Sequence, residues 1–119
     1  MTRDFDLIRE ILFQVEKSPS GEPLQFLSFK HKIDDAVVGE HLQLMIEADL
    51  IDGEVLSLRP VSFVIKRLTW TGQDFVSNAR NDTVWRRVMA DAKAKGTSVT
   101  MSVLNGLLTK GAQKYAGLG

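Results

Sequence analysis

The sequence predicts an α+β fold, and three observations support this prediction. Residues 34–53 combine a helix start, an amphipathic body and a helix stop in one run. Two strand-like segments, Glu54–Leu58 and Phe63–Leu68, follow and are joined by a short segment that contains a proline. Helical periodicity occurs before this stretch and returns after it. A small antiparallel hairpin flanked by helices is the pattern of an α+β domain.

The composition limits the class of protein. The chain has 119 residues, 44% of them hydrophobic, which is enough for the core of one small domain. It has no cysteine, which excludes disulfides and thiolate metal sites and favours a reducing compartment, so we expect a cytoplasmic protein. No apolar run approaches the roughly 20 residues that span a bilayer, and the N-terminus lacks the apolar core of a signal peptide. Neither secretion nor a membrane partner is expected.

The first predicted element is a helix over Asp4–Lys17. Asp4 and Asp6 lie in its first turn, where the helix dipole favours anions. Its expected apolar face consists of Phe5, Ile8, Ile11, Leu12 and Val15. Residues 18–21 end the helix, and the aromatic-rich segment Leu24–Phe29 is predicted to be a short strand, with a helical turn as the alternative.

The central helix is expected to begin at Asp34 or Asp35, either of which can cap the first turn with its carboxylate. The expected apolar face consists of Val37, Val38, His41, Leu42, Leu44, Met45, Ile46 and Ala48, and the polar stripe of Asp35, Gly39, Glu40, Gln43 and Glu47. The helix should stop near Ala48, because Asp49 adopts the left-handed conformation more easily than most residues. Residues 50–51 then fold back onto the apolar face.

The two strands are expected to form a hairpin connected by residues 59–62, with Pro60 at a turn position. Strict alternation in the second strand sends Val64, Lys66 and Leu68 to one face and Ile65, Arg67 and Thr69 to the other. Trp70 is expected to anchor the end of this strand in the core.

Three helices are predicted in the C-terminal part. Thr71 and Asp74 suggest a capping box for a short helix with Phe75, Val76 and Ala79 on its apolar face. Residues 81–83 restart a helix that ends at Gly96 and whose apolar face consists of Val84, Trp85, Val88, Met89 and Ala92. The last helix begins at Ser98 or Thr100, and its apolar face consists of Val99, Val103, Leu104, Leu107, Leu108, Ala112 and Tyr115.

The central helix followed by a hairpin resembles the recognition helix and wing of winged-helix proteins. Three blocks, Arg3–Leu12, His41–Ile51 and Arg67–Trp85, resemble a bacterial and phage family named domain of unknown function 2513. Where that family usually has Ala-Gly-Leu, this chain has Ala-Asp-Leu at residues 48–50, which keeps the helix stop. The resemblance implies a winged helix over residues 1–80, built from a helix, a short strand, the recognition-type helix and a two-stranded wing. Residues 81–119 are expected to form a helical extension that packs on it and mediates dimerisation.

The winged-helix interpretation leaves one alternative open. A helix-turn-helix needs a second helix before Asp34, and the residues left for it, Lys30–Ile33, are too few. Either the second helix is reduced to a turn, or residues 24–29 form it.

The charge pattern bears on function. Residues 1–60 contain twelve Asp and Glu against six Lys and Arg, a net charge of −6, whereas residues 61–119 contain three against nine, a net charge of +6. Because winged-helix proteins of bacteria and phages are most often DNA-binding regulators, the resemblance implies DNA binding as the first function. Gln43 would contact a base edge, and the phosphate contacts would come from Lys30, Lys32, Arg59, Lys66 and Arg67.

The alternative is a non-catalytic protein-interaction or dimerising module. The helix over residues 34–49 has five carboxylates and no Lys or Arg, so it would be repelled by phosphate rows. Glu40 and Glu47 would then bind a basic protein or the basic side of a second copy, which includes Arg86, Arg87, Lys93 and Lys95.

Catalysis and metal binding have little support in the sequence. It has no cysteine nucleophile, no paired histidines and no Gly-rich phosphate loop, so we expect no enzyme and no cofactor. His31 lies between two lysines without a ligand-spaced partner, and His41 is interpreted as a core histidine with satisfied hydrogen bonds. No metal site is expected.

Overall fold

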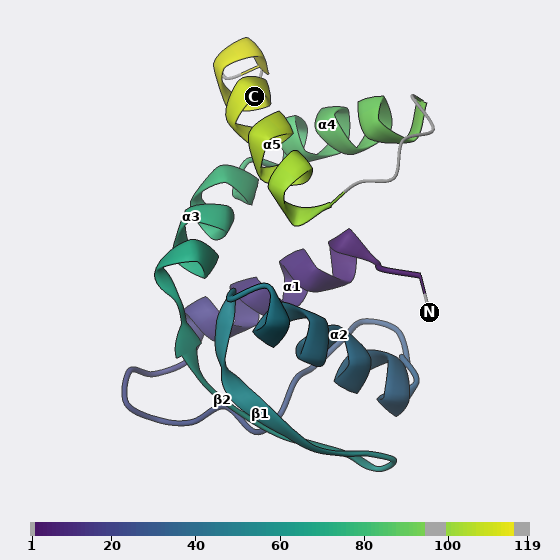
Figure 1. Ribbon diagram of the computed structural model, residues 1–119, viewed down its shortest axis with the longest axis vertical. Helices are drawn as coiled ribbons and strands as arrows, with labels where there is room; N and C mark the ends of the chain where they lie inside the picture. The colour runs from purple at the N-terminus through teal and green to yellow at the C-terminus, as the bar shows by residue number, and fades with distance from the viewer. Residues whose placement is uncertain (1, 95–99, 116–119) are drawn as a thin grey trace. The chain divides into compact units, whose positions relative to one another are not determined.

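The computed structural model describes residues 2–94 and 100–115, with side chains described as far as residue 111. This part of the chain has an α+β fold with five helices and one two-stranded antiparallel sheet (Figure 1). The elements are α1 Phe5–Lys17, α2 Asp35–Glu47, β1 Ile51–Leu58, β2 Val61–Leu68, α3 Trp70–Ala79, α4 Asp82–Ala94 and α5 Met101–Tyr115. No helix within the described ranges is both long and apolar enough to cross a membrane.

The chain divides into two compact units, Met1–Gln73 and Asp74–Gly119, with the boundary inside α3. In the first unit, α1 packs against β2, and α2 lies along the hairpin (Figure 1). In the second unit, α4 packs against α5. Each unit has its own set of buried apolar side chains.

The first helix forms as the sequence predicts. Asp4 caps it, because the backbone N–H of Leu7 donates to the Asp4 Oδ1 at 3.1 Å. The buried residues are Leu7, Ile8, Ile11, Leu12 and Val15. Phe5, expected on this face, is only half-buried, and Leu7 takes its place in the core.

The strand predicted over Leu24–Phe29 is wrong except at its first residue. Leu24 forms a single bridge to Ile65 of β2, with N–H to O distances of 2.8 and 2.9 Å between the two backbones. The Ser28 backbone pairs instead with the Gln14 side-chain amide, through hydrogen bonds of 2.8 and 3.0 Å. Because the Gln14 amide occupies the N–H and C=O groups of Ser28 that a neighbouring strand would pair with, the segment does not continue as a strand. Residues 18–34 also contain no helix, so the second helix of a helix-turn-helix is reduced to irregular chain.

The predicted end of α2 is confirmed. Ala48 is the C-cap, Asp49 has a φ of 59°, and the next two residues are buried. The buried residues of α2 are Val38, Gly39, His41, Leu42 and Met45. Gly39, expected on the polar stripe, is buried because the end of β1 packs on it: a Cβ there would lie 2.5 Å from Leu58 Cδ2.

Both strands are longer than predicted, and residues 59 and 60 alone form the turn. Asp52 pairs with Arg67 and Gly53 pairs with Ile65, so Lys66 is an extra residue in a β-bulge. The bulge shifts the alternation of β2, whose buried residues are Phe63, Ile65 and Leu68. The strict alternation predicted for this strand is therefore wrong.

Trp70 does not anchor the strand end, because its side chain is 84% exposed. Leu68 is the last buried residue of β2. Thr69 then caps α3, with its Oγ1 accepting a hydrogen bond from the N–H of Gly72 at 3.0 Å. Trp70 becomes the first residue of that helix, and the predicted start at Thr71 is wrong by two residues.

The second unit is built from three helices whose buried side chains largely match the prediction. These are Phe75, Val76, Ala79, Val84, Trp85, Val88, Ala92, Leu104 and Leu108. The rings of Phe75 and Trp85 meet edge to face, with centroids 6.1 Å apart and planes at 83°. Val103, predicted to be buried, is 47% exposed.

Two of the caps in this unit are as expected. The Asn81 side-chain oxygen accepts from the N–H of Val84 at 3.0 Å, and Thr100 Oγ1 accepts from the N–H of Val103 at 3.2 Å. The predictions for Lys95, Gly96, Ser98 and Val99 lie outside the described residues, as do those for the side chains of Ala112 and Tyr115.

Candidate functional site

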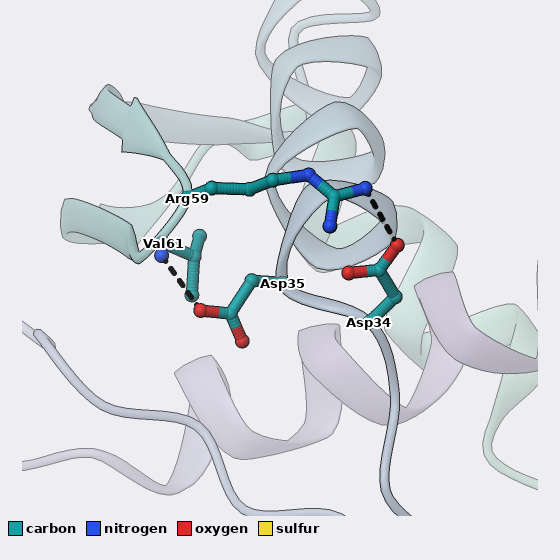
Figure 2. Close-up of polar contacts among 4 residues, drawn as sticks. All are labelled: Asp34, Asp35, Arg59 and Val61. Carbon is teal, nitrogen blue, oxygen red and sulfur yellow. Dashed lines mark hydrogen bonds and ion pairs between the residues drawn. The ribbon is translucent and has the colours of Figure 1, made fainter.

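The tip of the hairpin is fastened to the first turn of α2. The Arg59 guanidinium donates to the Asp34 carboxylate at 2.9 Å, and the backbone N–H of Val61 donates to the Asp35 carboxylate at 2.9 Å (Figure 2). The Asp34 side chain makes no capping hydrogen bond although Asp34 is the N-cap residue, and the Asp35 carboxylate accepts from Val61, so the capping prediction is wrong. We call these contacts the hairpin clamp; it sets the hairpin at a fixed position beside α2.

The outward side of α2 is acidic. Gln43 and Glu47 are exposed, and Glu40 is half-exposed. No Lys or Arg occurs between Asp35 and Glu47. Glu40 and Glu47, together with Gln43, are therefore available to a partner, but this side of the helix would repel an anion.

The cations predicted to contact DNA fall into two groups. Arg59 and Arg67 are already engaged within the first unit, Arg59 with Asp34 and Arg67 with Asp52, whose Oδ2 lies 3.7 Å from the Arg67 Nε. Lys30, Lys32 and Lys66 are exposed. None of these three lysines makes an ion pair with another residue of the described part of the chain.

The sequence interpretation misses a surface at the C-terminal end of α2. The Thr69 hydroxyl donates to the backbone carbonyl of Asp49, and the Thr69 N–H donates to that of Leu50 at 3.1 Å. Gly72 lies so close to Leu50, the residue before β1, that a Cβ there would be 2.0 Å from the Leu50 carbonyl oxygen. These contacts hold the start of α3 against the end of α2.

Trp70 is the large apolar side chain on this surface. It follows directly on Thr69, which bonds to Asp49, and three acidic residues of this region, Glu47, Asp49 and Asp52, are exposed. We call Trp70 with Glu47 and Asp49 the Trp70 surface, because the Asp52 carboxylate is already paired with Arg67. The sequence carried one usable signal: a threonine directly before the tryptophan can cap a helix, which places the tryptophan in its exposed first turn.

The interpretation of His41 as a core histidine is confirmed. Its side chain is fully buried, its Nδ1 lies 2.8 Å from the Val37 carbonyl oxygen, and its Nε2 accepts from the Asp4 N–H at 2.9 Å. Nδ1 therefore carries the hydrogen and donates it. Both ring nitrogens are occupied by the fold, so His41 is not a free ligand.

The basic residues of the alternative interpretation lie on α4 in the second unit. Arg86, Arg87 and Lys93 are exposed, and Arg87 has a contact within the described residues. No three His, Asp or Glu side chains gather into a possible metal site among the residues that the structure describes.

Comparison with known proteins assigns the family. The family described as hypothetical protein (DUF2513) matches residues 2–98. A protein of Haemophilus influenzae named "Uncharacterized protein" is 31% identical over 109 residues, which cover 87% of this chain and 89% of that protein. No solved structure matches the chain. The extent of the family match, together with this relative, shows that the chain belongs to the DUF2513 family.

Proposed function

We propose that the protein is a non-catalytic interaction module of the winged-helix type, which binds a cationic segment of a partner protein on the Trp70 surface. The observation that carries the proposal is the 84% exposure of Trp70, whose neighbour Thr69 bonds to the backbone of Asp49, in a region with exposed acidic residues. Tryptophan is enriched at protein interfaces, where it often supplies much of the binding energy. A tryptophan that is exposed in the folded protein is therefore a candidate contact residue for a partner.

The order of elements supports the winged-helix assignment. α1 is followed by the Leu24 bridge to β2, then by α2 and by the β1–β2 hairpin. The bridge acts as a one-residue third strand, and the hairpin clamp keeps the wing beside the recognition-type helix. A surface on such a helix and its flanks is a natural place for binding, although the fold alone does not choose the partner.

Charge favours a cationic partner over DNA. The first unit contains twelve Asp and Glu against eight Lys and Arg, and the pairs Arg59–Asp34 and Arg67–Asp52 neutralise two charges of each sign, so the acidic excess remains. A guanidinium or ammonium group placed over the Trp70 ring would gain about 0.5–2 kcal/mol from the cation–π contact, and the nearby carboxylates would add attraction. A phosphate row would meet the same carboxylates at a cost.

The cationic segment can come from another protein or from a second copy of this chain. Arg86 and Arg87 on α4 are exposed cations of the second unit and would suit the second source. If the segment comes from a second copy, the mass in solution rises with the concentration of this protein alone; if it comes from another protein, the mass rises only when that protein is added.

DNA binding is the second candidate, and one observation favours it. Lys30, Lys32 and Lys66 are exposed and unpaired among the described residues, and Gln43 is exposed on α2. The protein would then contact the DNA phosphates with these lysines rather than with Arg59 and Arg67, which are paired within the first unit.

Fluorescence anisotropy with two labelled probes separates the candidates. The probes are a short peptide of alternating arginine and glycine and a random DNA duplex, each measured at low and at moderate salt. We expect the peptide to bind in a salt-sensitive way, and Trp70→Ala to weaken its binding by about fivefold. Phe26→Ala is the matched control, because Phe26 is another exposed aromatic residue of the first unit, at 75% exposure. Binding of DNA but not of the peptide, with loss on Lys66→Ala, would overturn the proposal in favour of the second candidate.

A further inference from the structure

A groove of the first unit shares no residue with the Trp70 surface. It has a volume of about 350 Å³ and lies between α1 and residues 29–33. This volume is at the lower end of the range of small-molecule pockets. Its apolar lining consists of Phe13 of α1 together with Phe29 and Ile33, which are all half-buried. The size and this lining fit one small molecule with an apolar side chain.

One side of the groove is a stripe of α1. Its residues are spaced by three or four positions and therefore share one side of the helix: Asp6, Arg9, Glu10 and Phe13. The Arg9 guanidinium lies 4.7 Å from the centre of the Phe13 ring, and Asp6 and Arg9 each take part in a further interaction within the protein. Glu10 is exposed, and its carboxylate has no ion-pair or hydrogen-bond partner among the described residues. Glu10 therefore offers the unpaired charge of this side.

The other side, residues 29–33, is anchored at both of its ends. Just before it, the Ser28 backbone is held by the Gln14 side chain through hydrogen bonds of 2.8 and 3.0 Å. Just after it, the Asp34 carboxylate is held by the Arg59 guanidinium at 2.9 Å. A segment that is held before a ligand arrives loses less conformational freedom when the ligand binds. These anchors therefore favour binding of a small ligand without a large rearrangement.

The unpaired charges of the groove are one of each sign. Lys30 and His31 line the second side and are exposed. In the part of the chain that the structure describes, Lys30 and Glu10 form an ion pair neither with each other nor with another residue. A ligand with a single charge would be attracted to one of these two groups and repelled by the other. A ligand that carries both charges can pair with both.

We propose that this groove binds a free α-amino acid with an apolar side chain. The ammonium group of the ligand pairs with the Glu10 carboxylate, and its carboxylate pairs with the Lys30 ammonium group and the His31 ring. The apolar side chain of the ligand lies on the apolar lining. A few polar groups placed around an apolar pocket fix the orientation of a ligand and give specificity. The ligand is thus neutral overall, unlike the cationic segment bound by the Trp70 surface.

Backbone amide NMR of the isotope-labelled protein tests the proposal with three compounds. These are phenylalanine, phenethylamine, which lacks the carboxylate, and phenylpropanoate, which lacks the ammonium group. We expect phenylalanine to shift the signals of residues 29–33 and of the α1 stripe in a saturable way. Each of the other two compounds should bind about fivefold more weakly, because it loses one charge pair and keeps one repulsion.

Two variants assign each charge of the ligand to its partner. Glu10→Gln should weaken the binding of phenylalanine by about fivefold but not that of phenylpropanoate. Lys30→Gln should weaken the binding of phenylalanine by a similar factor but not that of phenethylamine. Glu22→Gln and Lys32→Gln are the matched controls, because these two residues are exposed charges of the same unit that do not line the groove. Both controls should change the affinity by less than about twofold.

Three results would overturn the proposal. Equal affinity for the three compounds would reduce the site to an apolar contact. Equal losses on Lys30→Gln and Lys32→Gln would reduce the effect to general charge. If phenylalanine caused no saturable shift of these signals up to its solubility limit, the groove would not be an amino-acid site. None of these results depends on Trp70, so the proposed function is tested separately.

Discussion

The two compact units are stabilised in different ways and carry opposite charges. Met1–Gln73 has twelve Asp and Glu against eight Lys and Arg, whereas Asp74–Gly119 has three against seven. The first unit is fastened by polar contacts between distant residues, such as Asp35 to Val61 and His41 to Asp4. In the second unit the caps are local and an apolar cluster joins the helices.

This difference bears on where the proposed binding surface lies. The polar contacts of the first unit hold backbone segments of the hairpin, of the start of α3 and of the chain before α2. A side chain on these segments can then be exposed although the backbone beside it is held, as at Trp70. In the second unit the described tryptophan, Trp85, is buried in the core.

The largest contrast is expected between the two tryptophans. Trp85 is 3% exposed, so Trp85→Ala should lower the free energy of unfolding of the protein by about 3–5 kcal/mol. Trp70→Ala should change it by less than about 0.5 kcal/mol, because the side chain packs on little. Urea denaturation of both variants measures the difference. A large loss of stability from Trp70→Ala would show that this side chain belongs to the core.

The glycines provide the next contrast. Gly72→Ala places a methyl group 2.0 Å from the Leu50 carbonyl oxygen, and we expect a loss of about 3 kcal/mol because the clash is with backbone. At Gly106 of α5 a Cβ would meet nothing within 4 Å. Gly106→Ala should therefore raise stability by up to about 1 kcal/mol. Thermal unfolding of the two variants checks both signs, and a tolerated Gly72→Ala would contradict the close approach of α3 to Leu50.

A hydrogen bond to the fully buried His41 of the first unit should matter more than one between two half-buried asparagines of the second. His41→Leu removes the acceptor of the Asp4 N–H and should cost about 1–3 kcal/mol of unfolding free energy. Asn78→Ala removes a 2.9 Å hydrogen bond to Asn105, but water can reach Asn78, so the cost should stay below about 1 kcal/mol. Denaturant midpoints at one pH rank the two variants, and the reverse ranking would contradict the role given to His41.

The smallest effects are expected in the hairpin clamp. Asp35→Ala leaves the Val61 N–H without its partner and should cost about 1 kcal/mol. Asp34→Ala breaks an ion pair whose side chains are 48% and 69% exposed, so it should cost less than about 0.5 kcal/mol. Hydrogen exchange of the Val61 amide distinguishes them, because Asp35→Ala alone should accelerate it strongly. If both variants accelerated the exchange equally, the ion pair of Asp34 would protect the Val61 amide as much as the hydrogen bond of Asp35 does.

Local signals in the sequence predicted the helices and the hairpin, because apolar spacing and turn residues act over a few positions. The stop of α2 at Asp49 and the caps at Asn81 and Thr100 are examples. Two kinds of feature could not be read in this way. The bulge at Lys66 depends on pairing across the hairpin, and the loss of the strand after Leu24 depends on the side chain of Gln14, which bonds to Ser28 fourteen residues later.

The site was predicted less well than the fold, for the same reason. The sequence identified the exposed positions of Gln43 and Glu47, which follow from helical periodicity. It did not show that Asp34 would neutralise Arg59, which is a contact between distant segments. Trp70 was assigned to the core because its exposure depends on where β2 ends and on the cap formed by Thr69.

The emission of Trp70 provides the most direct test of the proposed cationic partner. In a Trp85→Phe variant, Trp70 is the one remaining tryptophan of the chain. The account predicts that the arginine–glycine peptide changes this emission in a saturable way, that added salt reverses the change, and that duplex DNA leaves it unaltered. An emission that responds to DNA and not to the cationic peptide would contradict the account.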